Sequence, residues 1–215
     1  MKISNRVISL FLIAVLCLVL VSCSATDSAE TETSAVKESF ELRGDWKYYE
    51  SLRELKDDAD LIVIGDVSAI GTPYSWEYTE EDFNNADPDD DTYNISLMVM
   101  SIHTPYTVNV SDVLFNRNGY EIGETMQIDE NCGVFAGYEF KSKNAIEMEL
   151  EGKYIFALRA IELNGDYVYV TVSPYQGIAQ ITENADGTIS ITEYEYSNLY
   201  DDMTDIDEIK AALPG

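Results

Sequence analysis

Outside the first 23 residues, the chain has one thiol and one imidazole, Cys132 and His103. Together with an aspartate, such a pair can form the nucleophile and base of a thiol hydrolase. Neither residue lies in a recognisable catalytic motif, and an isolated cysteine between a strand and a glycine is more often a small buried hydrophobe. The sequence therefore favours a structural Cys132. The alternative is an exported enzyme or inhibitor-like module that uses Cys132 and His103, or paired loop carboxylates.

A run of carboxylates at residues 87–91 has the residue types that bind calcium, a cation that prefers several oxygen ligands. The candidate ligands are Asp87, Asp89 and Asp91. An EF-hand loop would have a glycine at its sixth position and a glutamate at its twelfth, where Thr92 and Met98 stand. The pattern is more typical of a solvated acidic loop, and a calcium-stabilised surface domain is the alternative.

Aromatic residues supply a third candidate site. Tyr74, Trp76 and Tyr78 stand at the start of a long polar segment, and Tyr167 and Tyr169 alternate in a predicted strand. Flat rings on a sheet face can stack on sugars or receive a peptide. Because tyrosine also suits half-buried strands, packing is the competing interpretation. We take these five residues as the candidate ligand-binding set.

Charge and motif content exclude several functional classes. The chain has 13 basic and 40 acidic residues, a net charge of −27, and no cluster of Lys and Arg, so nucleic acid is not an expected partner. Its glycines are scattered singly, unlike phosphate or dinucleotide loops. It has no Gly-x-Ser-x-Gly elbow and no His and Cys group with zinc spacing. We expect no cofactor and no catalytic residue.

The first residues have the organisation of an export signal. Basic residues precede an apolar run at residues 7–21, which is too short to span a hydrocarbon core of about 30 Å comfortably. The run ends in Leu20-Val21-Ser22-Cys23, which resembles the lipobox of bacterial lipoproteins. This resemblance implies removal of residues 1–22, lipidation of Cys23, and anchoring in a membrane outside the cytoplasm, on the cell surface or the periplasmic face. An ordinary cleaved signal is the alternative.

Composition divides the remaining chain into a tether and one domain. Residues 23–38 have too few large apolar side chains to offset their ordering entropy. Residues 39–215 have the size of a single domain, with an acidic insertion at residues 74–94. Because the other two cysteines belong to the signal and the lipidation site, we expect no disulfide at Cys132.

Hydrophobic periodicity predicts short strands between two helices. The run at residues 60–70 begins apolar on both faces, which is typical of a buried strand, and Gly65 marks a bulge or bend. Asn164-Gly165 predicts a tight hairpin. The predicted helices comprise residues 46–55, a turn at 145–150, and 204–213 with Thr204 as cap. The predicted strands comprise residues 60–70, 95–102 continuing through 106–115, 124–130, 153–163, 166–173, 177–182 and 188–194.

These elements predict a mainly β (α+β) domain, an antiparallel sheet with a short N-terminal helix and a C-terminal helix. Four segments resemble a small OB-fold-like barrel, related in shape to netrin-like domains, that occurs in bacterial lipoproteins: residues 59–67, 106–115, 123–128 and 150–158. The resemblance implies a barrel whose motifs are structural rather than catalytic. The acidic insertion departs from that pattern.

The sequence as a whole predicts a binding protein rather than an enzyme. We expect a lipid-anchored, non-catalytic surface module that interacts with an unknown protein or glycan through a barrel face or through the insertion.

Overall fold

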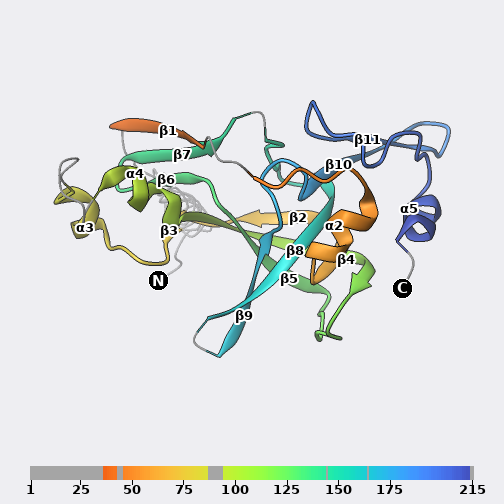
Figure 1. The fold of residues 1–215 in the computed structure, drawn as a ribbon, viewed down its shortest axis with the longest axis horizontal. Helices are drawn as coiled ribbons and strands as arrows, with labels where there is room; N and C mark the ends of the chain where they lie inside the picture. Colours follow the sequence, from red (N-terminus) through yellow and green to blue (C-terminus); the bar gives the residue numbers. More distant parts are fainter. Residues whose placement is uncertain (1–35, 43–45, 87–93, 144, 164, 214–215) are drawn as a thin grey trace, which may run out of the picture. The chain divides into compact units, whose positions relative to one another are not determined.

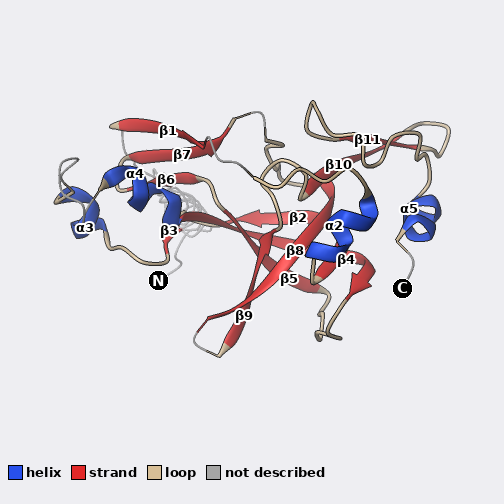
Figure 2. Ribbon diagram, in the orientation of Figure 1, coloured by secondary structure: helices blue, strands red, loops and turns tan. Residues whose placement is uncertain are grey.

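Strands form most of the ordered elements of this chain (Figures 1 and 2). The computed structural model describes residues 36–42, 46–86, 94–143, 145–163 and 165–213. The strands are β1 (Glu38–Leu42), β2 (Leu61–Ile70), β3 (Tyr74–Ser75), β4 (Ile102–Asn116), β5 (Thr125–Glu130), β6 (Gly133–Phe135), β7 (Tyr138–Ser142), β8 (Lys153–Leu163), β9 (Asp166–Thr171), β10 (Ile178–Glu183) and β11 (Ile189–Thr192). The helices are α2 (Leu52–Asp58), α3 (Glu80–Asn84), α4 (Ile95–Met98), the 3-10 turn η1 (Val99–Ser101) and α5 (Ile206–Ala212). The prediction of a mainly β domain is confirmed.

Strand β2 is central to the larger sheet. It pairs antiparallel with β4 on one edge and with β8 on the other. Its alternate side chains enter different apolar clusters, with Ile62 and Ile64 in one and Leu61 and Val63 in the other. All four side chains are fully buried, which confirms the two-sided burial predicted for this run.

Five strands are linked in a circuit of backbone ladders. β8 pairs with β2, β2 with β4, and β4 with β5, all antiparallel. β5 pairs parallel with β9 through Ile128↔Tyr169 and Asp129↔Val170, and β9 pairs antiparallel with β8. The first half of β8 also pairs with β10. The ends of β5 and β9 are therefore neighbours, although β6, β7 and β8 separate them in the sequence.

A close approach of β4 explains the glycine within β2. The β2–β4 register shifts between Ile64 and Gly65. A Cβ at Gly65 would lie 2.4 Å from Val108 Cγ1, a separation that side chains do not tolerate. The irregularity predicted at Gly65 is confirmed.

Three apolar clusters hold these elements together. The first is formed by one face of the neighbouring strands β2, β8, β10 and β11 and by residues of the helices α2 and α5, and it contains Tyr49 and Ile209. The second includes Val108 and uses the other face of the same strands. The third joins α3, α4 and β7 around Phe83 and Phe140. Full burial of each large side chain contributes roughly 1.5–3 kcal/mol, so these clusters supply most of the favourable folding free energy.

The segment before β4 is helical, and the strand predicted at residues 95–102 is wrong over most of its length. Asn94 caps α4 by accepting a backbone N–H, and η1 follows directly. Ile95, Met98 and Val99 are buried at helical spacing against the third cluster. Packing therefore prevails over the strand propensity of the β-branched residues.

The insertion at residues 74–94 has secondary structure of its own where it is described. β3 pairs with the start of β4. Helix α3 begins with a capping box in which Thr79 and Asp82 exchange hydrogen bonds, and its Phe83 is fully buried. The described part of the insertion is thus packed against the rest of the domain.

Several other details differ from the prediction. Helix α2 begins at Leu52, later than predicted, because Ser51 caps it. Helix α5 is capped by Asp205 rather than Thr204, and residues 145–150 form no helix. Two pairings, β1–β7 and β5–β9, are parallel in a fold predicted to be antiparallel. The errors in caps and in strand pairing concern features that local periodicity does not encode.

Some predictions concern residues outside the described ranges. They include the signal at residues 1–22, lipidation of Cys23, and the candidate calcium ligands Asp87, Asp89 and Asp91. Strand β1 begins at Glu38, the last residue of the predicted tether. Within the described ranges, no helix combines the length and the apolar character that crossing a bilayer requires.

Candidate ligand-binding site

A cavity of about 260 Å³ lies where β4, β5, β8 and β9 meet. Both tryptophans of the chain, Trp46 and Trp76, line it, and we call it the tryptophan pocket. Its polar lining includes His103, Asp129 and Glu130. The cavity depends on the parallel β5–β9 pairing, which places Asp129 opposite Val170.

Exposure divides the lining of the tryptophan pocket into an edge and an interior. At the edge, Trp46, Met100 and Ile161 are 40%, 48% and 37% exposed, and Arg159 is the one exposed charged residue of the lining. His103, Asp129 and Glu130 are no more than 8% exposed. An apolar edge that leads to buried polar groups is the usual composition of a small-molecule site.

The ring of Trp76 is stacked on the ring of His103. Their centroids are 3.9 Å apart and their planes differ by 10°. The short ladder between β3 and β4 pairs Tyr74 with His103, and the backbone N–H of Trp76 donates to the Ser101 carbonyl at 3.3 Å. The insertion therefore delivers an indole to the pocket on a fixed backbone.

A chain of hydrogen bonds fixes the carboxylate of Asp129. The Trp76 Nε1–H donates to the Tyr74 hydroxyl at 2.9 Å, and that hydroxyl donates to Asp129 Oδ2. Gln127 Nε2 donates to Asp129 Oδ1 at 2.8 Å. Burial, followed by the hydrogen bond to Asp129, raises the pKa of Tyr74 to about 12. Tyr74 thus remains a proton donor to Asp129 at neutral pH.

Glu130 is buried between two cavities. Thr171 Oγ1 donates to its Oε2 at 2.8 Å. Burial raises the pKa of Glu130 to about 7, and the Thr171 hydrogen bond acts in the opposite direction. At neutral pH this carboxyl group exchanges readily between its two protonation states.

His103 is buried with an unsatisfied ring nitrogen. Its Nδ1 has no hydrogen-bond partner, although the residue is only 8% exposed. Burial lowers the pKa of His103 to about 4, despite the opposing charge of Asp129. The ring is therefore neutral at physiological pH, and a buried polar atom without a partner requires a functional or structural explanation.

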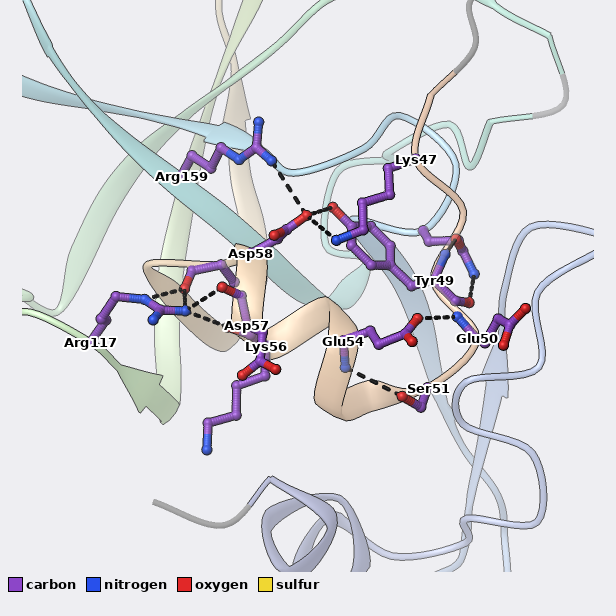
Figure 3. Close-up of polar contacts among 12 residues, drawn as sticks. Lys47, Tyr49, Glu50, Ser51, Glu54, Lys56, Asp57, Asp58, Arg117 and Arg159 are labelled. Atoms are coloured by element: carbon purple, nitrogen blue, oxygen red, sulfur yellow. Dashed lines mark hydrogen bonds and ion pairs between the residues drawn. The ribbon is translucent and has the colours of Figure 1, made fainter.

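Asp58 holds one side of the tryptophan pocket in place (Figure 3). Its Oδ2 accepts from Lys47 Nζ at 2.8 Å and from the Tyr49 hydroxyl at 3.1 Å, and it lies 3.7 Å from Arg159 Nη2. Lys47 follows Trp46 directly, and Arg159 lines the pocket. One carboxylate thus fixes both the segment that carries Trp46 and the basic residue of the lining.

Arg117 in turn stabilises the end of the helix that carries Asp58 (Figure 3). Its Nη2 donates to the carbonyls of Lys56, Asp57 and Ala59 at 2.8, 2.7 and 2.9 Å. These are carbonyls at and just beyond the last turn of α2, where a cation is favourable.

A second cavity, of about 290 Å³, lies on the other side of Glu130. We call it the thiol pocket because Cys132 lines it, with Tyr106 and Ser142. Burial, and then the charge of Glu130, raises the pKa of Cys132 to about 12. A thiol with this pKa has almost no thiolate at neutral pH, so it is a poor nucleophile.

The structure places the predicted site residues in four different surroundings. Cys132 and His103 line different cavities. Tyr74 and Trp76 belong to the tryptophan pocket and its hydrogen-bond network. Tyr78 packs edge-on against Phe83 in the third cluster. Tyr167 and Tyr169 pack around Tyr120, with centroids 5.0 and 6.1 Å from its ring.

Sequence reasoning missed the acidic half of the tryptophan pocket. Asp129 and Glu130 end a predicted strand, where carboxylates usually mark the exit to solvent. The local sequence shows only one relevant feature, the alternation of Ile128 with Gln127 and Asp129. Their burial results from the β5–β9 pairing, a contact between distant segments.

Within the described residues, no group of three or more His, Cys, Asp and Glu side chains is arranged to hold a metal ion. No protein-family model matches this chain, and the searches of curated proteins and of solved structures likewise found no match.

Proposed function

We propose that this chain is a lipid-anchored, non-catalytic binding module that holds a small ligand in the tryptophan pocket, outside the cytoplasm. The observation that supports this most strongly is the pocket itself. An exposed apolar edge with Trp46 leads to a buried interior in which His103 Nδ1 has no partner. Groups with shifted pKa values that converge in a cavity are typical of functional sites.

The proposal includes an OB-like barrel as the scaffold of the pocket. The five-membered circuit of ladders through β2, β4, β5, β9 and β8 supports it, because an OB-fold is a five-stranded Greek-key barrel. In this arrangement the parallel β5–β9 link closes the barrel and creates the pocket beside it.

A non-catalytic role agrees with the chemistry of the two cavities. The Cys132 thiol is protonated at neutral pH, and His103 lines the other cavity. A nucleophile and its base need to lie within hydrogen-bond reach of one another. Binding therefore explains the buried polar groups better than thiol catalysis does.

Anchoring rests on the lipobox-like sequence that ends at Cys23. We expect Cys23→Ala to move the chain from the membrane fraction to the soluble fraction of a bacterial host that lipidates exported proteins. Metabolic labelling with a fatty-acid analogue measures the lipid directly. Labelling that persists in Cys23→Ala would contradict this part of the proposal.

Intrinsic fluorescence tests the pocket directly, because both tryptophans of the chain line it. We expect the full chain in detergent to show a saturable change of tryptophan emission with at least one member of a small-molecule fragment set. Trp46→Leu should weaken the binding of that ligand. Tyr167→Leu, which removes an exposed aromatic ring outside the pocket, should leave the binding unchanged. Equal effects of the two variants, or the absence of any saturable change, would overturn the proposed function.

A further inference from the structure

The charges of the tryptophan pocket favour a positively charged ligand. Asp129 lines it, together with Glu130, which is negatively charged for part of the time at neutral pH, and the His103 ring is neutral. The basic residue of the lining, Arg159, already lies 3.7 Å from Asp58. Because the net charge of the chain is −27, the surrounding field also attracts cations.

The hydrogen-bond pattern argues against a ligand that needs many direct polar contacts. Asp129 accepts from Tyr74 and Gln127, and Glu130 accepts from Thr171. The remaining lining is largely apolar and includes Ile161, Val170 and Pro174. A sugar would bury several hydroxyl groups against these walls at a cost of roughly 1–3 kcal/mol for each unsatisfied group.

Aromatic faces complement the carboxylates. Trp46 is 40% exposed at the edge, and Trp76 lies further in, stacked on His103. Indole is the side chain that attracts organic cations most strongly, by about 0.5–2 kcal/mol. An alkylated ammonium group presents a diffuse charge and an apolar surface, and this combination matches indoles, aliphatic walls and carboxylates together.

We infer that the tryptophan pocket binds a small organic ammonium ion, an inference that rests on the proposed function of the same site. The volume of about 260 Å³ is slightly below the usual range of ligand pockets, about 300–1,000 Å³, which suits a molecule the size of choline rather than a peptide. The ammonium group can belong to a free metabolite or to a lipid headgroup, and both offer the same chemistry to the pocket.

A titration of matched probes tests the inference in the full chain in detergent. Choline and tetramethylammonium should change tryptophan emission with saturation. The uncharged carbon analogue of choline, 3,3-dimethylbutan-1-ol, should bind at least about ten-fold more weakly because it lacks the charge. Detergent-free chain released by Cys23→Ala, titrated with phosphatidylcholine and phosphatidylglycerol vesicles, distinguishes a lipid headgroup from a free ion as the source.

Variants separate the pocket from the general acidity of the chain. Asp129→Asn should lower the affinity for choline by about ten-fold. Glu124 is exposed and lies outside both cavities, so Glu124→Gln should leave this affinity within about two-fold of wild type. Trp46→Leu is the second test. Because Trp46 is exposed, its replacement should keep the fold, and we expect the affinity for choline to fall several-fold. Near-UV circular dichroism verifies the folded state of each variant.

The outcomes separate this inference from the proposed function. Equal affinity for choline and its uncharged analogue, or equal effects of Asp129→Asn and Glu124→Gln, would overturn the ammonium ligand. Binding of acetate or N-acetylglucosamine in place of choline would also overturn it, yet it would leave the pocket as a binding site. If no probe and no fragment binds, both the ammonium ligand and the proposed binding function are overturned.

Discussion

The two cavities that share Glu130 are similar in volume but differ at their entrances. The exposed residues that line the tryptophan pocket are the apolar Trp46, Met100 and Ile161, together with Arg159, which lies 3.7 Å from Asp58. The exposed residues that line the thiol pocket are Lys141 and Glu147. Each cavity also has a buried polar atom without a partner, His103 Nδ1 in the first and Ser142 Oγ in the second.

This comparison shows that entrance chemistry, more than volume, distinguishes a candidate site. Apolar side chains at an edge remain in contact with water until something covers them, whereas charged side chains are well solvated. The buried groups differ as well. His103 is held in a neutral state beside carboxylates, while the Cys132 thiol is made unreactive. We therefore assign ligand binding to the tryptophan pocket and a structural role to the thiol pocket.

The largest expected effect comes from the wall of the thiol pocket. Gly133 has a φ of +126°, and a Cβ there would lie 2.5 Å from Thr104 Oγ1. We expect Gly133→Ala to lower the free energy of unfolding by about 3 kcal/mol or more, through strain and overlap. Urea unfolding measures this loss. Trp46→Leu, at the exposed edge of the other pocket, should cost less than about 1 kcal/mol, and a similar loss in both variants would contradict the assignment.

Glu130 should make stability depend on pH. Burial raises its pKa from 4.5 to about 7, so the folded chain keeps a proton that the unfolded chain has lost. The corresponding stability is fully present below pH 4.5 and is lost as the pH rises to about 7. Because glutamine does not titrate, the free energy of unfolding of Glu130→Gln should rise by about 3 kcal/mol relative to that of wild type between about pH 4.5 and 8. The measurement is urea unfolding of both proteins at pH 4.5 and at pH 8. An equal difference in the free energy of unfolding between wild type and Glu130→Gln at the two pH values would refute this.

His103 should have the opposite pH dependence, of similar size. Burial lowers its pKa from 6.5 to about 4, so its contribution is present above pH 6.5 and is lost as the pH falls to about 4. In wild type the two residues oppose each other between about pH 4.5 and 6.5, which predicts a shallow profile. His103→Phe keeps a ring beside Trp76 and should reveal a stability that falls by about 2–3 kcal/mol as the pH rises through this window. An unchanged profile would show that His103 is not neutral when folded.

The smallest effect on binding should come from Cys132. Its raised pKa of about 12, against an ordinary value of 9, reduces the thiolate population by roughly a thousand-fold. We expect alkylation of Cys132 to be slow in the folded chain and fast in urea, as measured by peptide mass spectrometry. Cys132→Ala should leave the fluorescence titration unchanged. A loss of binding in that variant would connect the two cavities and weaken their separation.

Strand identity was largely predictable because it depends on local patterns. The run at 153–163 matches β8 in full, and the hairpin predicted at Asn164-Gly165 has strands β8 and β9 on its two sides. The helix α4 was missed although Ile95, Met98 and Val99 have helical spacing, since β-branched residues in a short apolar run suit a strand equally well. Short segments carry too little periodicity to decide between the two.

By itself, the sequence determined the mainly β composition and the two-sided burial of β2, because both follow from neighbouring residues. Only the tertiary structure decided that Trp46, His103, Asp129 and Glu130 share one cavity. Their meeting depends on the parallel pairing of β5 with β9, which joins segments far apart in the chain. Burial then sets which of these groups carry charge, and burial is a property of the packed fold rather than of any local stretch.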